Sequence, residues 1–559
     1  MLTFSQNGPE AEKQMRAVIF YLTTFGYIDG DFDAAEKEFV RGYIQKLIAH
    51  RVQGANLEPA LAAELTQKFT THFFEVFETI DREVKDLFTE AVAEGEEQNT
   101  FVHAKLKLRC FEIFKSFDES NQEQLMGTID ELIQADGTVH PAEAKFRGEL
   151  ADLLNEDLGV ELIDEGAARP VAVSRGAKLP TGDKDNPFFS QFEQHYAADR
   201  DALDRQVRED RQLMDRVMAI WEQQRGLGQG KLRGKQQVSE FAPGSEFLDG
   251  HTYVMTPDPA RRYELTIIGD LHGCYSCLKA VLNQTDFFRK VAEYERNPET
   301  AVCPKLVLLG DYIDRGMFSY QGVLRSVLQL FAKAPDHVVL LRGNHEYYIE
   351  HKGKVYGAVR PSEAMDTLKP HFSDEIFQHY IRLFEAMPNV LLFERYMFVH
   401  GGIPKDSTIK TLYKDLSSLN EWDMRFQMMW SDPSSADVIP AALQDQSARF
   451  PFGKLQCQAF LQRIGCHTIF RGHEKVEEGF RETYAEDTYS LFTVFSSGGS
   501  TNDDLPLDSS YRSVEPMAAT LRFENGNGEV TPFLIDYESF NDPKRNRFYQ
   551  SMPGLAPSA

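Results

Sequence analysis

Five short apolar segments constrain this chain more than any other feature, because each is followed within three residues by glycine and by a side chain able to bind a metal. The segments are 265–268, 306–309, 338–341, 396–399 and 468–470, and they run into GDLHG, GDYIDRG, RGNHE, HGG and RGHE. Apolar runs of this length, separated by helical patterns and turns, indicate buried strands of an α/β domain. Ligands bind where the strands of such a sheet end, so we expect these polar groups to form one site.

The side chains in these motifs suit a pair of divalent metal ions. Two ions about 3.5–4 Å apart can clamp a phosphoryl group and hold a shared hydroxide that attacks phosphorus in line. The expected ligands are Asp311 as the bridge, Asp270 and His272 at one ion, and Asn344, His400 and His473 at the other. Carboxylate, amide and imidazole ligands predict manganese, with iron or zinc as alternatives.

Phosphate chemistry also needs fixed positive charge and a proton donor. Arg315 and Arg471 each lie within a few residues of an expected ligand, and a guanidinium group can contact two phosphate oxygens at once. His345 directly follows Asn344. We predict that His345 protonates the leaving oxygen and that Asp314 orients its imidazole.

Taken together, the motifs closely resemble those of the metallophosphoesterase superfamily and, within it, the phosphoprotein phosphatase (PPP) family of Ser/Thr protein phosphatases. The resemblance covers residues 263–500, and the block Trp430-Ser431-Asp432-Pro433 adds to it. It implies a metallophosphoesterase β-sandwich flanked by helices, a dinuclear metal centre and hydrolysis of phosphomonoesters. By position, it also implies the same metal ligands, the same arginines at the phosphate and the Asp314–His345 pair.

Two departures from the family pattern leave the substrate preference open. The family places a further phosphate-binding arginine shortly before a Phe-x-Phe-Gly stretch, which is here residues 450–453, and counting back puts Gln446 at that position. Arg449 is the candidate to replace it. The loop Ser497–Ser500 also lacks the Tyr and Cys that are familiar in eukaryotic relatives.

The chain as a whole divides into four regions. Residues 1–165 show helical periodicity and predict an all-α N-terminal domain. Residues 166–250 read as a linker that contains a long amphipathic helix at about 187–225. Its narrow apolar stripe either packs along a neighbouring domain or pairs with another copy of the chain. Residues 251–540 form the predicted catalytic domain, and 541–559 are expected to be a flexible tail.

A short pattern occurs twice in the N-terminal domain, as Asp29-Gly30 followed by Glu36 and as Asp136-Gly137 followed by Glu143. Asp-Gly is typical of a tight turn, and an acidic residue at the start of a helix suits the helix dipole. The repeat indicates either two helix–turn–helix units or a regulatory metal or partner site. It resembles the tellurite-resistance TerB-like helical domain. Self-association or partner docking through this domain or the 187–225 helix stays open.

Composition excludes several classes of protein. The chain has 60 Lys and Arg against 86 Asp and Glu, a formal net charge of −26, which argues against binding nucleic acid or anionic membrane as its main function. No apolar run is long enough for a membrane span, and the N-terminus lacks a signal-peptide pattern. Six Cys in 559 residues predict no disulfide framework and a cytoplasmic setting. Cys274 and Cys277 are interpreted as core residues of a helix, with a redox role as the alternative.

We therefore predict a metal-dependent phosphoprotein (Ser/Thr) phosphatase of bacterial type, with an N-terminal helical module that localises or regulates it. The alternatives are a dinucleoside-polyphosphate hydrolase of the same superfamily and a non-catalytic, phosphatase-like scaffold. The rival hydrolase usually carries Asp after the Asn-His pair, where this chain has Glu346. The sequence does not identify the phosphoprotein substrate, the native metal pair, the oligomeric state or the effect of the helical module.

Overall fold

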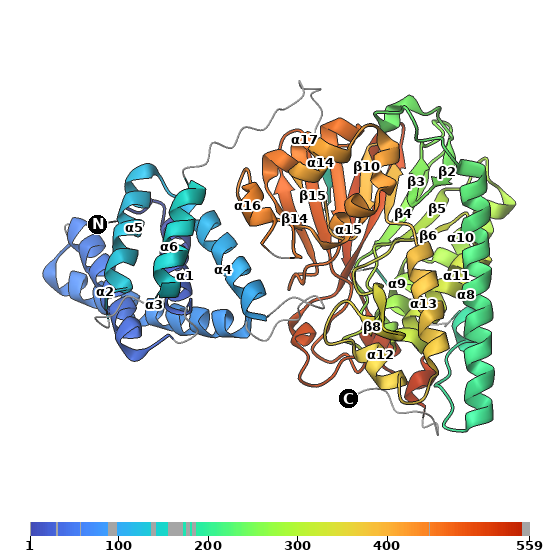
Figure 1. Cartoon of the computed structure of the whole chain (residues 1–559), viewed down its shortest axis with the longest axis horizontal. Coiled ribbons are helices and arrows are strands. Elements are labelled where there is room, and N and C mark those ends of the chain that lie inside the picture. The colour runs from blue at the N-terminus through green and yellow to red at the C-terminus, as the bar shows by residue number, and fades with distance from the viewer. Residues whose placement is uncertain are drawn as a thin grey trace. The chain divides into compact units, whose positions relative to one another are not determined.

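The structure is a computed structural model that describes residues 2–28, 32–55, 57–87, 98–135, 141–154, 171–174, 179–181, 186–446 and 448–550. The chain divides into two units (Figure 1). Unit 1 comprises Met1–Gly159 together with Ser434–Ala448, and unit 2 comprises Val160–Pro433 and Arg449–Ala559. The sequence analysis did not anticipate that Ser434–Ala448, from the middle of the predicted catalytic domain, belongs with the N-terminal helices.

Unit 1 is built from amphipathic helices, which confirms the all-α prediction. Its core buries side chains at helical spacing, such as Val18 and Leu22 of the first helix and Phe73 and Phe77 of the third. The helices are α1 (Gly8–Gly26), α2 (Ala34–Gly54), α3 (Pro59–Leu87), α4 (Gln98–Lys115), α5 (Glu119–Leu132), α6 (Pro141–Leu154) and α16 (Ala441–Gln444).

Helix α2 begins at an acidic pair, as the first copy of the repeat predicts. The Asp33 carboxylate accepts a hydrogen bond from Glu36 N (2.8 Å), and the Glu36 carboxylate accepts one from Asp33 N (3.0 Å). This reciprocal cap satisfies two backbone donors at the helix start. The Asp-Gly dipeptides at 29–30 and 136–137 lie outside the described residues, so the metal or partner interpretation of the repeat stays untested.

Unit 2 contains two large mixed sheets and two small strand pairs. In spatial order, the six-stranded sheet is β1 (Ala172–Val173), β17 (Asn527–Leu534), β16 (Met517–Glu524), β4 (Tyr263–Ile268), β5 (Cys303–Leu308) and β6 (Val338–Leu340). The seven-stranded sheet is β14 (Phe480–Ala485), β15 (Ser490–Val494), β13 (Thr468–Arg471), β10 (Tyr396–Val399), β9 (Val390–Phe393), β3 (Thr252–Met255) and β2 (Glu246–Asp249). The small pairs are β7 (Tyr348–His351) with β8 (Lys354–Gly357) and β11 (Asp432–Pro433) with β12 (Pro451–Phe452).

The seven-stranded sheet is buried on both faces, because its strands alternate between two apolar cores. In β10, Tyr396 and Phe398 enter one core and Met397 and Val399 the other, as the two-residue period of a strand requires. The first core is shared with the six-stranded sheet; for example, the ring of Phe393 lies 5.4 Å from that of Phe523 in β16. The predicted α/β sandwich flanked by helices is thereby confirmed.

Helices cover the outer faces of the two sheets. Side chains of α14 (Asp406–Leu412), α15 (Trp422–Trp430) and α17 (Lys454–Ile464) join the core outside the seven-stranded sheet. On the side of the six-stranded sheet, core side chains come from α9 (Tyr275–Gln284), α10 (Phe287–Arg296), α11 (Arg325–Lys333), α12 (Glu363–Leu368) and α13 (Asp374–Ala386). Helix α8 (Arg200–Gly228) packs on α11, on α13 and on β2 of the seven-stranded sheet. In the described part of the chain, no helix combines the length and apolarity that crossing a membrane requires.

The predicted helix at 187–225 is two helices, α7 (Pro187–Ser190) and α8. Between them the chain turns so that Tyr196 is buried, with its hydroxyl donating to Asp210 Oδ2 (2.7 Å). The Asp199 side chain then caps α8 by accepting from Ala202 N (2.9 Å). A buried tertiary contact therefore overrides the helical periodicity. The apolar stripe of α8 packs within unit 2 against α11 and α13.

The chain from 541 to 550 packs on unit 2, so the predicted start of a flexible tail at 541 is wrong. Phe548 is buried and its ring stacks on Phe318 with centroids 4.7 Å apart. The Tyr549 hydroxyl donates to the buried Asp504 carboxylate. Aromatic burial in this stretch outweighs its loop-like composition. Residues 551–559 lie outside the described residues.

Helix α8 offers a test of the unit 2 core. Trp221 is fully buried, with its ring 5.1 Å from that of Phe331. We expect Trp221→Ala to lower the free energy of unfolding of unit 2 by about 3–5 kcal/mol, because it removes a large buried side chain and leaves a cavity. Denaturant titration measures this. Leu227→Ala on the same helix, where the side chain is 72% exposed, is the control and should leave the midpoint unchanged.

Candidate metal centre

The polar residues that follow strands of both sheets converge in unit 2. The two sheets meet where Asp270, just beyond β4, forms a bridge with Phe495, just beyond β15. All six predicted metal ligands are buried, with 8% or less of each residue exposed. The structure thus brings together Asp270 and His272 beyond β4, Asp311 beyond β5, Asn344 beyond β6, His400 beyond β10 and His473 beyond β13.

Asp311 lies at the centre of this cluster. Its carboxylate forms one group with His272 and His345 and another with His400 and His473, and within each group the ligand atoms lie within 4.8 Å of one another. Asp311 Oδ2 is 3.5 Å from His272 Nε2 and 3.4 Å from His400 Nε2. A carboxylate shared by two sets of nitrogen donors is the arrangement that a bridging ligand needs.

Backbone carbonyls orient two of the imidazoles as ligands. His272 Nδ1 donates to Ile313 O (2.9 Å) and His400 Nδ1 donates to Leu309 O (3.0 Å). In the neutral ring this leaves the lone pair on Nε2, which is the nitrogen that faces Asp311 in both cases. The Asn344 amide completes the cluster, with one terminal atom 2.9 Å from His400 Nε2 and 3.1 Å from His473 Nδ1.

Several residues of the motifs adopt left-handed backbone conformations. His272, Asp311, Asp314, Arg315 and His473 have φ values of 42°, 53°, 66°, 65° and 71°. Such conformations are unfavourable for residues with a side chain and gather at functional sites, where the surrounding structure imposes them. They turn the chain sharply after each strand and so direct the side chains into the cluster.

The motif glycines allow backbone to pass directly beside the buried carboxylates. A Cβ atom at Gly472 would lie 2.1 Å from Asp270 Oδ1, and one at Gly343 would lie 2.1 Å from Asp311 Oδ1. No side chain fits at these distances. The recurrence of glycine next to each polar residue therefore has a steric cause in the site itself.

The cluster concentrates negative charge away from water. Burial and the charge of Asp311 raise the pKa of Asp270 to about 7 and that of Glu346 to about 8. Burial also acts on Asp311, but the neighbouring His400 and His345 outweigh it and lower its pKa. Buried like charges repel unless positive charge lies between them. The donor set and its excess of carboxylates therefore fit divalent cations, which carboxylate, amide and imidazole ligands bind.

Asp314 and His345 form a pair at the edge of this cluster. His345 Nδ1 lies 2.7 Å from Asp314 Oδ2, and the second oxygen of Asp314 accepts from Ala364 N (2.9 Å). Burial raises the pKa of Asp314 to about 6 and lowers that of His345 to about 4. Since Asp314 occupies Nδ1, Nε2 is the nitrogen of His345 that is left for a substrate.

Two of the predicted phosphate-binding arginines have protein partners. Arg315 Nη1 lies 2.7 Å from Glu363 Oε1 of α12. Arg471 is fully buried, and its guanidinium donates to Ser431 O (3.1 Å) and pairs with Asp432 Oδ1 (2.7 Å) and Glu474 Oε2 (2.6 Å). Contact of either arginine with phosphate stays a prediction.

Arg449 also lies at the cluster. Its Nη1 donates to His473 Nε2 and is 3.5 Å from Asp432 Oδ2. Gln446, which occupies the position of the family arginine, belongs instead to unit 1. Arg449, unlike Gln446, therefore belongs to unit 2 and lies beside the predicted metal ligands.

Comparison with known proteins agrees with this geometry. Residues 263–477 match the family model of the calcineurin-like phosphoesterases. Residues 263–477 form a calcineurin-like phosphoesterase domain. This phosphoesterase unit has curated homologues among the Ser/Thr protein phosphatases, which confirms the predicted family and the predicted class of enzyme, a metal-dependent phosphatase. The match does not include residues 1–159 of the helical unit, and their TerB-like assignment stays a prediction.

Two of the relatives are serine/threonine-protein phosphatase 4 catalytic subunits. The protein from Kluyveromyces lactis is 29% identical over 250 residues, which cover 44% of this chain and 70% of the relative. The protein from Saccharomyces cerevisiae is 28% identical over 237 residues, which cover 42% of this chain and 68% of the relative. A solved Saccharomyces cerevisiae protein serine/threonine phosphatase with similarity to human phosphatase PP5 aligns with a TM-score of 0.35 at 17% identity, over 59% of this chain and 90% of that one.

The sequence analysis missed three residues of the phosphoesterase site. The Glu346 carboxylate accepts hydrogen bonds from Asp311 N (2.8 Å) and Tyr312 N (2.9 Å) and so holds the loop that carries the bridging aspartate. Asp432 joins Arg471 to Arg449. The ring of Tyr511 lies 5.4 Å from that of His272. Tyr511 follows the loop Ser497–Ser500, which lacks the tyrosine familiar in eukaryotic relatives. Glu346 and Asp432 stand inside recognised motifs, which was the available signal.

Cys274 and Cys277, which follow the first motif of the phosphoesterase, are core residues, as the sequence predicts. Both are buried and free. Cys274 Sγ lies 3.0 Å from Ser497 Oγ, and Asn502 donates to Cys277 Sγ (3.5 Å). Burial raises the pKa of Cys277 well above its ordinary value, which disfavours the reactive thiolate.

The shared position of Asp311 leads to a prediction on metal content. We expect Asp311→Asn to reduce bound manganese from about two ions per chain to less than one, because a bridging carboxylate contributes to both ions. Elemental analysis after manganese loading and gel filtration measures this. Asp508→Asn, at an exposed position of the same unit, is the control. Retention of both ions by Asp311→Asn would remove Asp311 from the role of bridge.

Proposed function

We propose that this chain is a protein phosphatase that hydrolyses phosphoserine and phosphothreonine esters with two divalent metal ions, manganese before iron or zinc. The observation that carries the proposal is that the Asp311 carboxylate is shared by two nitrogen-donor groups, with the Asp314–His345 pair beside it. The yeast relatives, which are serine/threonine-protein phosphatase 4 catalytic subunits, support the same substrate class.

The proposed metal ligands are Asp311 and the five other predicted residues around it. Hydrogen bonds to backbone carbonyls orient two of their imidazoles. When bound, divalent cations supply positive charge to a phosphoryl group and lower the pKa of the attacking water. Arg315 and Arg449 bind the phosphoryl oxygens. His473 would hold a metal ion through Nδ1, and its Nε2 lies 3.7 Å from Asp432 Oδ1, which would help to orient the ring. Arg449, whose Nη1 lies beside His473 Nε2, would direct its guanidinium to the phosphate.

The remaining chemistry belongs to the Asp314–His345 pair. Water forms a bond to phosphorus as the ester P–O bond breaks on the opposite side, and the electrons of that bond go to the seryl or threonyl oxygen. His345 donates the Nε2 proton to this oxygen, and Asp314 stabilises the imidazolium through Nδ1. The products are inorganic phosphate and the free hydroxyl side chain. A general acid is needed because an alkoxide is a poor leaving group.

His345 is tested by its dependence on the leaving group. We expect His345→Asn to keep its metal but to lower kcat on a phosphoserine peptide about 10²–10⁴-fold, the usual contribution of a general acid. An aryl phosphate such as p-nitrophenyl phosphate has a leaving group that needs no protonation, so its kcat should fall much less. Steady-state kinetics with both substrates measures the difference. Equal losses on both would show that His345 is not the proton donor.

A substrate panel tests the proposed function as a whole. The manganese-loaded full chain is given phosphoserine and phosphothreonine peptides, diadenosine tetraphosphate and a phosphodiester, and released phosphate or nucleotide is measured. We expect the highest kcat/KM on the phosphopeptides. Turnover of the dinucleotide alone would favour the polyphosphate hydrolase. Full metal occupancy without any turnover would favour a non-catalytic scaffold.

A further inference from the structure

Unit 1 reaches the metal centre of unit 2 through the covalent chain. The polypeptide leaves unit 2 after β11 and returns at Arg449, just before β12. The two strands pair in parallel, with Asp432 opposite Pro451. We call the stretch between them, Ser434–Ala448, the inserted segment; it belongs to unit 1.

The residues on either side of the inserted segment lie in the phosphoesterase site. Asp432 Oδ1 is 2.7 Å from Arg471 Nη2 and 3.7 Å from His473 Nε2. Arg449 contacts His473 and Asp432. Asp432 is two residues from the start of the inserted segment, and Arg449 directly follows its end. The inserted segment is therefore joined through the backbone to two side chains of the site.

One buried carboxylate of unit 1 holds the start of the inserted segment. Glu112, in α4, is 7% exposed. Its Oε1 accepts hydrogen bonds from Ser434 Oγ (2.6 Å) and Ser435 N (3.1 Å), and its Oε2 pairs with Arg109 Nη1 (2.9 Å). A buried carboxylate is stable only when its oxygens have such donors. The Ser434 and Ser435 donors come from the inserted segment, so the contact orders both Glu112 and the start of that segment.

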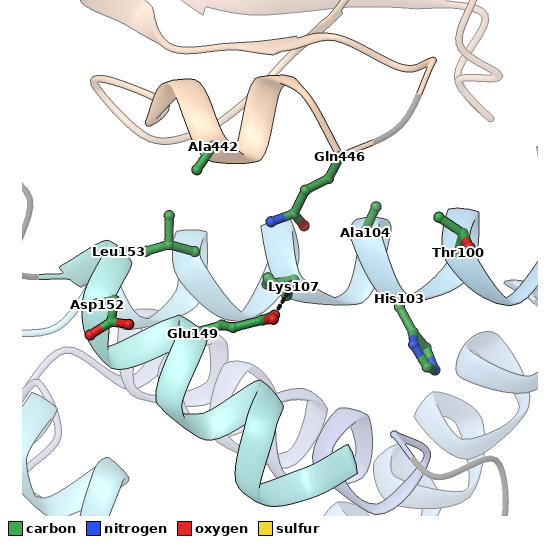
Figure 2. Close-up of a pocket in the computed structure, with 9 residues that line it drawn as sticks. All are labelled: Thr100, His103, Ala104, Lys107, Glu149, Asp152, Leu153, Ala442 and Gln446. Carbon is green, nitrogen blue, oxygen red and sulfur yellow. Dashed lines mark hydrogen bonds and ion pairs between the residues drawn. The ribbon is translucent and has the colours of Figure 1, made fainter. Parts of the chain in front are cut away.

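Buried apolar side chains hold the middle of the inserted segment in the core of unit 1, whereas residues nearer its end line a cavity. Ile439 is 1% exposed and Leu443 is 3% exposed, both in the core of unit 1. Further along, Ala442 and Gln446 line a cavity of about 790 Å³ beside α4 and α6 (Figure 2). The Glu112 contact is at the end of the inserted segment that lies next to Asp432.

We infer that Glu112 of the helical unit is a positioning residue for the phosphatase site: by holding Ser434 and Ser435, it sets the place of Asp432 and, through Asp432, that of Arg449. The inference rests on the proposed function only for the identity of the bound anion. It gives the helical unit a defined action on the site, transmitted through Pro433, the one residue between Asp432 and Ser434. A change in α4 would then alter phosphate binding without touching a metal ligand.

The test measures binding of inorganic phosphate to the manganese-loaded full chain by calorimetry, with kcat and KM on a phosphopeptide alongside. We expect Glu112→Ala to weaken phosphate binding about tenfold and to raise KM by a similar factor, because the Asp432–Arg449 pair is no longer held. Glu112→Gln, which keeps an oxygen acceptor, should recover part of the loss. Glu123→Gln, at an exposed position of the neighbouring α5, is the control and should bind phosphate as the unsubstituted chain does.

A double-mutant cycle separates this role from a general loss of stability. If Glu112 acts through Asp432, Glu112→Ala combined with Asp432→Asn should bind phosphate no more weakly than Asp432→Asn alone. Ser434→Ala removes one donor without emptying the buried carboxylate site, and it should weaken binding in the same direction. Additive losses, or phosphate binding within twofold of the unsubstituted chain in Glu112→Ala, would overturn the inference. Phosphate binding that depends on Glu112 in a protein that does not hydrolyse phosphopeptides would overturn the proposed function and leave the inference standing.

Discussion

The mutual repulsion of buried carboxylates is the constraint on which the rest of unit 2 depends. Asp270 and Asp311 lie out of reach of water at the ends of adjacent strands, and the charge of Asp311 together with burial raises the pKa of Asp270 to about 7. A fold can keep such a pair only if positive charge is supplied at the same place. The surrounding imidazoles and the cations that they fit meet that need, and they make the site suitable for binding a phosphoryl group.

The fold brings the buried carboxylates together by holding the site loops in unfavourable backbone conformations. Two sheets meet beyond β4 and β15, so loops from both reach one point. The loops carry residues with positive φ, and glycines stand where backbone passes beside a carboxylate. Unfavourable conformations of this kind persist when many surrounding contacts impose them. In unit 2 the two apolar cores on either side of the seven-stranded sheet provide those contacts.

The helical unit and the phosphoesterase unit are linked by more than the N-terminal connection. Because Ser434–Ala448 belongs to unit 1, the chain passes three times from one unit to the other. Two of those passages adjoin Asp432 and Arg449, which contact His473, a predicted metal ligand. A helical module attached in this way is joined by short stretches of backbone to Asp432 and Arg449, whereas an attachment at the N-terminus alone would not be.

Local patterns in the sequence determined the strands, the motif loops and the chemical identity of the site. Short apolar runs indicate buried strands, and glycine with Asp or His directly after a strand indicates a ligand-binding loop. Both signals are local, so the ligands from Asp270 to His473 could be predicted from the sequence. The structure brings these residues together. Only the tertiary structure decided which apolar faces meet. Tyr196 interrupts a helical pattern because its hydroxyl finds Asp210, and Phe548 packs on Phe318 within a loop-like sequence. The hydrogen bond between Glu112 and Ser434 joins residues far apart in the chain. Such a contact gives no periodic signal in the sequence, because it depends on how two surfaces fit together and not on the local sequence pattern.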